Sequence, residues 1–389
     1  MAKILISLTY FEPNISGVTV YAKRLAEGLV SLGHEVTILT SHYQKQLPFE
    51  ENRNGLRIVR SPVLARLGKG VLMPFFPFTA YRLVKEVDSV NCHLPQFEAL
   101  FLAFWAKLLG KKLILTHHTD LSGWPGLWNH LAEGVTNLSQ FFTCLLADKI
   151  VTYTKDYADH SAFLSHFKKK LVFIYPPITV ARPDREYKKK LARKLAKVDY
   201  RIGFSGRIAR QKGIPILLKA IPFLKESLSG SFKIIFAGPK EIIGEDFMKE
   251  ITPLIRLYRQ YLLFLGPLSQ EKLASFYQII DLLVLPSDDT LESFGLVQVE
   301  AMLFGKPVVA PNLPGVRVPV KETSQGKIFL VGDFRDLAAK ISQVLKNRQR
   351  FKARPEVAEK IFSYQKTLRQ YQELLAPFSD KYEQTLLGN

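Results

Sequence analysis

Short apolar runs alternate with segments of helical periodicity along this chain, and the alternation constrains its fold more than any other feature. In the first half these runs include Lys3–Leu8, Glu35–Leu39 and Lys112–Thr116. Between the first two, Val18–Leu32 places its apolar residues along one helical stripe, and Gly33 ends the segment. Strands that alternate with helices form a parallel sheet with helices on both faces. The sequence therefore predicts a doubly wound α/β fold.

The alternation occurs twice. It breaks at Tyr175-Pro176-Pro177 and resumes at Arg201–Phe204. Four further strands are predicted in the second half: Lys233–Ala237, Tyr261–Leu265, Leu282–Leu285 and Pro307–Ala310. A chain of 389 residues also exceeds what one hydrophobic core usually organises. We expect two domains, 1–180 and 181–362.

Composition excludes several classes of protein. The chain is 47% apolar and 23% charged, which is typical of a globular protein and too apolar for a disordered one. Two cysteines, Cys92 and Cys144, provide no disulfide framework, so a reducing, cytoplasmic location is expected. The most apolar window, Ala99–Leu109, contains Lys107 and is too short to span a bilayer. We therefore expect no membrane crossing.

The net charge of +19 is the one unusual bulk property. Residues 1–180 hold 19 Lys and Arg against 13 Asp and Glu, whereas residues 181–389 hold 35 against 22. Much of the excess lies in Arg182–Arg201 and Lys340–Arg369. Such stripes suit an anionic partner, either lipid headgroups or nucleic acid. Solvated helix faces that keep the protein soluble explain the same pattern.

An acidic pair marks the strongest motif. Glu292 and Glu300 lie eight residues apart in ESFGLVQVE. A helix that begins near Ser293 would contain Glu300 and leave Glu292 on the preceding loop. The N–H groups at that helix start, which would receive a diphosphate, belong to Phe294, Gly295 and Leu296. An amphipathic helix with a capping acid and a surface Glu is the alternative.

A basic loop follows the strand predicted at Arg201–Phe204. The strand ends at the small residue Gly206, and the loop then offers Arg207 and Lys212 before a helix. Cations at this position can bind a pyrophosphate. As isolated residues they are equally typical of a solvated surface.

Together these motifs resemble a known family. Gly206-Arg207 with Lys212-Gly213, followed by the Glu292–Glu300 motif, resembles the retaining glycosyltransferases of family 4, as do Tyr10–Val18 and Gly33–Val36. The resemblance covers nearly the whole chain. It implies the GT-B fold, in which two Rossmann-like doubly wound domains face a central cleft. It also implies that the C-terminal segment, 363–389, returns to the N-terminal domain.

The resemblance assigns a role to each motif residue. The donor is a nucleotide-diphosphate sugar, with Arg207 and Lys212 on the diphosphate beside Gly206. Glu300 accepts hydrogen bonds from the ribose, and Glu292 contacts the transferred sugar. Ser16 departs from the family, which often has glycine there in a Gly-Gly loop. Gly17 remains, so the main chain can still approach the diphosphate.

The resemblance also places a histidine beside the donor sugar. His118 matches this position in THHTD, and His117 fits it less well. The two histidines with Asp120 form a possible metal set, but adjacent residues on a strand point to opposite faces. Asp288-Asp289 is similarly interpreted as part of a loop. We expect no metal and no cofactor.

The acceptor is expected at the N-terminal domain. Arg57–Arg60 and Arg66–Phe78 place cations beside aromatic residues, which is typical of docking on anionic lipid. Trp124 and Leu127-Trp128 add further aromatics. The preferred acceptor is a lipid or lipid-linked glycan at the inner face of the cell membrane. Core packing of these aromatics, and a soluble sugar acceptor, remain alternatives.

Two other functions are compatible with parts of the sequence. A nucleotide-sugar epimerase would use the same diphosphate site, and a nucleic-acid-binding protein would explain the charge alone. The charge comes without the stacking motifs of nucleic-acid recognition, so no nucleic acid is expected. The sequence leaves open UDP or GDP, and glucose, mannose, galactose or N-acetylglucosamine, as well as the oligomeric state.

Overall fold

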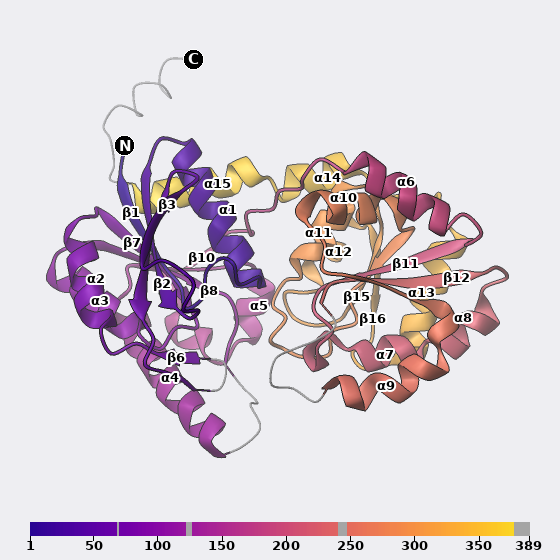
Figure 1. Ribbon diagram of the computed structural model, residues 1–389, viewed down its shortest axis with the longest axis horizontal. Coiled ribbons are helices and arrows are strands. Elements are labelled where there is room, and N and C mark those ends of the chain that lie inside the picture. The colour runs from indigo at the N-terminus through magenta and orange to yellow at the C-terminus, as the bar shows by residue number, and fades with distance from the viewer. Residues whose placement is uncertain (68–69, 122–126, 240–246, 377–389) are drawn as a thin grey trace. The chain divides into compact units, whose positions relative to one another are not determined.

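The protein is described from a computed structural model, which covers residues 1–67, 70–121, 127–239 and 247–376 (Figure 1). The chain forms two compact units. Of the described residues, unit 1 contains those of 1–177 together with 364–376, and unit 2 contains those of 178–363. The break after Pro177 lies close to the expected boundary at residue 180. The C-terminal helix belongs to unit 1.

Unit 1 is built on one eight-stranded sheet and a separate hairpin. Its strands are β1 (Lys3–Ser7), β2 (Glu35–His42), β3 (Glu50–Arg53), β4 (Leu56–Pro62), β5 (Ala65–Leu67), β6 (Gly70–Leu72), β7 (Ser89–Leu94), β8 (Lys112–His117), β9 (Lys149–Thr152) and β10 (Leu171–Phe173). The sheet order is β10-β9-β8-β7-β1-β2-β4-β3, and every pair is parallel except β3 with β4. Strands β5 and β6 form the hairpin.

Helices cover both faces of this sheet. They are α1 (Gly17–Ser31), α2 (Phe76–Lys85), α3 (Ala99–Leu108), α4 (Leu127–Leu146), α5 (Lys155–His160), the 3-10 segment η1 (Leu164–Lys170) and α15 (Tyr364–Leu375). Val90 and Cys92 of β7 share a core with α2 and α3. The alternate residues Asn91 and His93 face α1 and α15, because Asn91 bonds Thr116, which in turn contacts Tyr371 of α15. Strand β7 is therefore fully buried, although polar and apolar residues alternate along it.

Unit 2 has a six-stranded sheet in which every pair is parallel. Its strands are β11 (Tyr200–Ser205), β12 (Phe232–Ala237), β13 (Leu262–Gly266), β14 (Leu282–Val284), β15 (Val308–Pro311) and β16 (Gly326–Phe329). Its helices are α6 (Arg185–Lys194), η2 (Arg210–Lys212), α7 (Ile214–Lys219), α8 (Ile221–Ser227), α9 (Phe247–Leu257), η3 (Arg259–Tyr261), α10 (Gln270–Ile279), α11 (Leu296–Leu303), α12 (Val318–Thr323), α13 (Phe334–Lys346) and α14 (Pro355–Ile361). The strand order is β13-β12-β11-β14-β15-β16.

The core of unit 2 follows the same period of two. Ile202 and Phe204 are buried with residues of α7, α8 and α13. Gly203, between them, faces the other side, where Phe276 and Ile280 approach to 2.9 Å and 2.6 Å of the position that a Cβ atom would take. A larger side chain at this position would push α10 away from the sheet.

The expected doubly wound α/β fold is confirmed in both units. Cys92 and Cys144 are buried and unbridged. Within the described part of the chain, no helix has both the length and the apolar character that a membrane span requires.

Candidate functional site

The strand order of unit 2 changes direction between β11 and β14. From this pair the chain builds outward through β12 and β13 on one side and through β15 and β16 on the other. The loops that leave the carboxyl ends of β11 and β14 therefore diverge, and open parallel sheets bind ligands at such a point. Arg207 and Lys212 lie after β11, and Glu292 lies after β14.

Lys212 and Glu292 form an ion pair across these two loops, although they are 80 residues apart in sequence. The lysine side chain is 23% exposed and the glutamate side chain 15%, so solvent reaches the pair. Gly213 permits the approach of the loops. It has a φ of 62°, and a Cβ atom on it would lie 1.8 Å from the carbonyl oxygen of Pro286. Any other residue at Gly213 would force the loops apart.

The turn after β11 is fixed by its main chain. The Gly206 N–H donates to Ala237 O at 2.9 Å, and the Ile208 N–H donates to Pro239 O at 3.2 Å. Arg207 stands between these two anchored residues, and its side chain is exposed. These two hydrogen bonds fix the turn that carries Arg207. Lys212 follows five residues later in the same connection.

Helix α11 begins later than the sequence indicated. It starts at Leu296 and not near Ser293, because Gly295 adopts a φ of 76° at the N-cap. A Cβ atom there would lie 2.5 Å from the side chain of Leu285. Phe294 precedes the cap, is 1% exposed and packs its ring against Phe362. The side chain of Phe294 thus belongs to the core, and the helix presents the main chain of Gly295 and Leu296 at its positive end.

Glu300 lies in α11, as the sequence predicted, and is 6% exposed. Its Oε2 accepts a hydrogen bond of 2.8 Å from the hydroxyl of Tyr277. Tyr277 is itself buried in α10. The tyrosine fixes the orientation of the carboxylate before any ligand arrives.

Asp288 and Asp289 serve the loop that leads to Glu292. The Asp289 side chain accepts from the Leu291 N–H at 2.9 Å, and its carbonyl accepts from the Glu292 N–H at 3.1 Å. Burial, and to a lesser degree the neighbouring Asp289, raises the pKa of Asp288. Among the residues that the structure describes, no three His, Cys, Asp or Glu side chains are grouped to hold a metal ion.

In unit 1 the strand order changes direction between β1 and β7. The loop after β1 ends at Ser16, which is the N-cap of α1: its Oγ accepts from the Thr19 N–H at 3.2 Å. Gly17 opens the helix, is exposed, and has no atom within 4 Å of the position of a Cβ atom. The packing of unit 1 therefore does not require glycine at residue 17, whereas Ser16 has a capping role that a glycine would lose.

His118 follows β8 and is buried within unit 1. Its Nε2 lies 2.8 Å from His93 Nδ1, and its Nδ1 is hydrogen-bonded to the hydroxyl of Tyr153. The ring of Tyr21 packs edge-on against it at 5.1 Å. Burial, followed by the neighbouring histidines, lowers the pKa of His118 well below its usual value. The ring is therefore neutral at pH 7, and both of its nitrogens have partners inside the protein.

His117 points away from His118, as expected for neighbours on a strand. Its Nε2 lies 3.4 Å from Asp120 Oδ1, and its ring stacks on Phe163. Burial lowers the pKa of His117 to about 4, against the opposing effect of Asp120. The two histidines thus belong to separate contacts.

Two buried polar residues after β7, Gln96 and Glu98, were not predicted from the sequence. Gln96 accepts from Ser7 Oγ at 3.0 Å, and Glu98 is 2% exposed. Burial raises the pKa of Glu98 to about 7. Within the described residues, Glu98 Oε1 and Gln96 Nε2 have no hydrogen-bond partner. Pro95, placed between a short run and the apolar helix, was the signal that a strand ends here.

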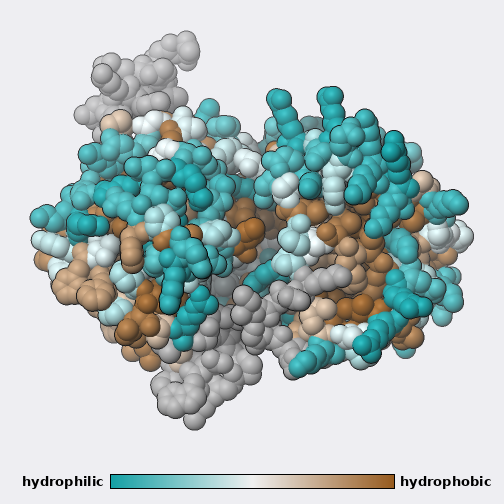
Figure 2. All heavy atoms as spheres, viewed as in Figure 1, coloured by the Kyte–Doolittle hydropathy of each residue, from teal (hydrophilic) through white to brown (hydrophobic). Residues whose placement is uncertain are grey.

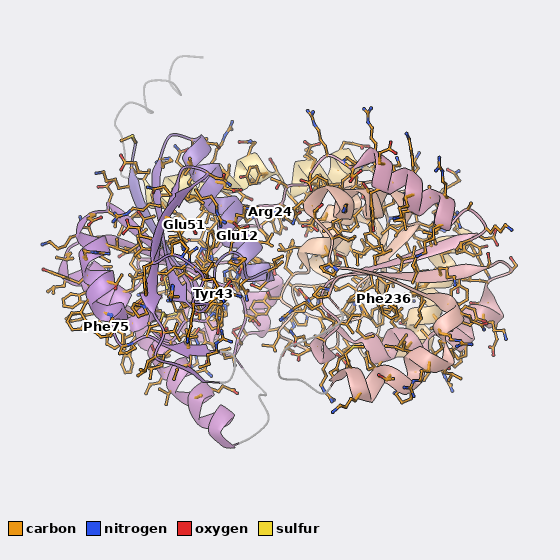
Figure 3. All side chains as sticks on the ribbon, in the orientation of Figure 1. Glu12, Arg24, Tyr43, Glu51, Phe75 and Phe236 are labelled. Carbon is orange, nitrogen blue, oxygen red and sulfur yellow. The ribbon has the colours of Figure 1, made fainter. Side chains whose placement is uncertain are left out.

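The expectation of a basic surface at Arg57–Arg60 is wrong. Arg57 is paired with Glu50 at 2.6 Å and with Glu86 at 2.7 Å. Arg60 is 2% exposed and paired at 2.5 Å with Glu51, which Figure 3 labels. These arginines hold the sheet edge together, because Glu50 and Glu51 of β3 pair with them diagonally across the β3–β4 ladder.

The aromatic residues of 66–78 divide between core and surface. Phe76 is fully buried, whereas Phe75 and Phe78 are exposed. Lys69 and Trp124 lie outside the described residues, as does the side chain of Trp128.

Comparisons with known proteins agree with the fold. The family described as "Glycosyl transferases group 1" matches residues 186–361, and "Glycosyltransferase Family 4" matches residues 15–182. An uncharacterized glycosyltransferase of Methanocaldococcus jannaschii is 26% identical over 329 residues, 80% of each chain. A D-inositol 3-phosphate glycosyltransferase of Paenarthrobacter aurescens is 25% identical over 339 residues, covering 80% of this chain and 79% of the relative.

Two solved structures share the fold. Anabaena HepE in complex with UDP is similar with a TM-score of 0.76 at 18% identity, over 97% of this chain and 100% of HepE. Sucrose-phosphate synthase from Thermosynechococcus elongatus is similar with a TM-score of 0.74 at 18% identity, over 100% of both chains.

Proposed function

Because this chain belongs to the GT-B glycosyltransferases of the family 4 type, we propose that it transfers a hexose from a nucleotide-diphosphate sugar to an acceptor hydroxyl with retention of configuration. The observation that carries this proposal is the convergence of Lys212 and Glu292 at the β11–β14 switch, beside Arg207. Cations at the carboxyl end of a parallel sheet suit a diphosphate, and a carboxylate beside them suits sugar hydroxyls.

Each candidate site residue in unit 2 has one proposed role. Arg207 and Lys212 neutralise the diphosphate, and the main chain of residues 294–296 donates to it at the start of α11. Glu300, oriented by Tyr277, accepts from the ribose hydroxyls. Lys212 is neutralised by Glu292. Donor binding exchanges that carboxylate for phosphate oxygens, which releases Glu292 to accept from the hydroxyls of the transferred sugar.

The transfer breaks the bond between the anomeric carbon and the leaving phosphate oxygen. The acceptor oxygen bonds to the same face of that carbon, and its proton passes to the departing diphosphate. The positive charges of Arg207 and Lys212 stabilise the negative charge that develops on the leaving group. This chemistry assigns no covalent nucleophile and requires no metal.

Unit 1 supplies Gly17, His118 and the acceptor site. Because both nitrogens of His118 are bonded inside the protein, its ring acts as a positioning group that holds the main chain at the end of β8. The unpartnered polar atoms of Gln96 and Glu98 lie after β7, beside the strand reversal where acceptor hydroxyls are expected. The acceptor is a lipid or lipid-linked glycan, reached from the cytoplasm by a peripheral protein.

UDP is the first nucleotide to test. The HepE structures contain UDP and UDP-glucose, which supports a UDP-sugar donor in this chain. GDP-mannose and UDP-N-acetylglucosamine are the alternatives.

The test follows donor cleavage by proton NMR. The protein is incubated with UDP-glucose, UDP-N-acetylglucosamine or GDP-mannose, without acceptor, and the first anomer released is identified. Retention predicts that the anomer released has the configuration of the donor. The diphosphate site predicts that Lys212→Ala slows release by roughly 10²–10³-fold, whereas Lys219→Ala, at an exposed lysine on α7, does not. Release of the opposite anomer contradicts retention. Conversion of the donor to an isomer without release of nucleotide would instead identify an epimerase.

A further inference from the structure

Exposed apolar side chains are concentrated on three consecutive helices of unit 1. Among the described residues, 20 large hydrophobic side chains are exposed, and ten of them belong to α2 with its cap residue, α3 and α4. The residues that define this α2–α4 face are Phe75, Phe78, Phe101, Phe104, Leu138 and Phe142. Phe78 is 73% exposed, so most of its side chain is accessible to solvent. Such a cluster marks an interaction surface.

Helical spacing aligns the exposed residues into stripes. Phe101 and Phe104 are followed by Leu108, and Leu138 and Phe142 by Leu145, so each set repeats every three or four residues. Helix α3 packs against both α2 and α4, which brings the stripes side by side. Figure 2 shows apolar residues gathered at the lower left of unit 1, over α2 and α3, and Figure 3 labels Phe75 at this edge.

Cations outnumber acidic residues around the α2–α4 face. Residues 73–112 contain five Lys and Arg against three Asp and Glu. Of the three acids Glu98 is buried and Glu86 is paired with Arg57, while Lys107 is paired with Asp148 at 2.5 Å. Arg82 and Lys85 are exposed on α2. Lys168 and Lys169 are exposed beside the end of α4, where Lys170 Nζ donates to Leu145 O at 2.6 Å. An apolar centre with a basic rim is complementary to an anionic bilayer.

We propose that the α2–α4 face docks on an anionic lipid bilayer, with its aromatic and leucine side chains in the interfacial layer and Arg82, Lys85, Lys168 and Lys169 on the headgroups. This inference rests on the proposed function in one respect: a lipid-linked acceptor requires the enzyme to work at the membrane. It places the docking surface on α2, α3 and α4, and not on the paired arginines of β4.

A second copy of the chain is the competing occupant of this face. In a symmetric dimer the same patch meets itself, so Arg82 and Lys85 of one copy would lie near the cations of the other. Like charges across an interface oppose association, whereas anionic headgroups neutralise them. The charge pattern therefore favours lipid.

The experiment measures cosedimentation with vesicles. Vesicles of phosphatidylcholine with phosphatidylglycerol are compared with vesicles of phosphatidylcholine alone. The triple variant Phe78→Gln, Phe104→Gln, Phe142→Gln removes apolar contact, and Arg82→Gln with Lys85→Gln removes charge. The matched control replaces three exposed apolar residues of unit 2 by glutamine: Val180, Leu257 and Leu330.

We expect the wild-type protein and the control to bind the anionic vesicles and not the neutral ones. The triple variant should bind at least roughly a hundredfold more weakly. The charge variant should bind about 30-fold more weakly, at about 1 kcal/mol per cation. All variants should keep the thermal stabilisation by donor that the wild-type protein shows.

Two results would overturn the inference. One is equal vesicle binding by the triple variant and the control. The other is a wild-type dimer, seen by sedimentation velocity, that the triple variant converts to a monomer without any vesicle binding by either protein. Vesicle binding through the α2–α4 face by a protein that shows no nucleotide stabilisation would reject the proposed function and leave the docking surface standing.

Discussion

The carboxyl-end loops of unit 2 carry charged side chains that solvent reaches, whereas the equivalent end of unit 1 carries neutral rings that are buried. Lys212 and Glu292 are paired in partly exposed loops. His93 and His118 are bonded to each other, and burial lowers the pKa of both. Partly exposed charged groups such as Lys212 and Glu292 can change partners without repacking of the protein core. Changes in unit 2 should therefore alter function, and changes in unit 1 should first alter stability.

The largest expected effect is on catalysis. Lys212→Ala should lower kcat/KM for donor cleavage by roughly 10²–10³-fold, because a cation on the leaving group is lost. Its melting temperature should hardly change, since a partly exposed ion pair contributes little stability. Lys219→Ala is the matched control. Wild-type activity in Lys212→Ala would contradict the expectation that the charged loops of unit 2 control function.

The next effect is a pH dependence in unit 1. The pKa of Glu98 is raised to about 7 in the folded protein, from 4.5. The unfolded chain therefore loses its proton first, and stability falls as pH rises from 4.5 to 7. Glu98→Gln abolishes this loss, so the variant should gain about 2 kcal/mol relative to wild type between about pH 5 and pH 8. Urea unfolding of both proteins at the two pH values measures the gain. A constant difference would show that Glu98 is ionised in the folded protein.

A smaller effect, on stability, is expected where α15 packs against α1 and β8 within unit 1. The Tyr371 hydroxyl lies 2.7 Å from that of Tyr21 and 2.9 Å from Thr116 Oγ1. Tyr371→Phe should lower the free energy of unfolding by about 1–3 kcal/mol, because it leaves buried partners unsatisfied. Arg369→Gln, at an exposed position of the same helix, is the control. Equal stability of the two variants in urea would mean that this network is dispensable.

The smallest effect tests the loop after β1. Ser16→Ala removes the cap of α1 and should cost about 1 kcal/mol, whereas Ser16→Gly should cost only a few tenths. Ser16→Gly also restores the Gly-Gly pattern of the family. Thermal unfolding gives both stabilities, and donor titration shows whether the second glycine alters affinity. Equal stability of Ser16→Ala and the wild-type protein would contradict the capping role.

The strands of unit 2 were largely predictable, because β-branched and leucine-rich runs alternate there with helical segments. In the sheet of unit 1, strands β3, β4, β7 and β10 were not predicted. Strand β7 was missed since its sequence, SVNCHL, places Asn91 and His93 among the apolar residues, and only the contacts with Thr116 and Tyr21 explain them. The start of α11 was placed too early because Gly295 has a positive φ and lies close to Leu285, which directly follows β14 and is ten residues away in sequence.

The candidate site residues were proposed from motifs, but the contacts that they make were not predictable. Nothing local connects Lys212 with Glu292, or Tyr277 with Glu300, because each pair is formed by loops and helices distant in sequence. Arg60 was misjudged for the same reason: its partner Glu51 comes from the antiparallel edge strand β3, which the sequence did not indicate.

The most direct test of a nucleotide-sugar site in unit 2 is thermal stabilisation by UDP, GDP and their sugar conjugates. It is measured on the wild-type protein, Glu300→Ala and Lys212→Ala. We expect one nucleotide family to raise the melting temperature of the wild-type protein, since a ligand that binds only the folded state stabilises it. Both variants should lose most of that rise while remaining folded. No stabilisation of the wild-type protein by any nucleotide, or undiminished stabilisation of both variants, would contradict the assignment.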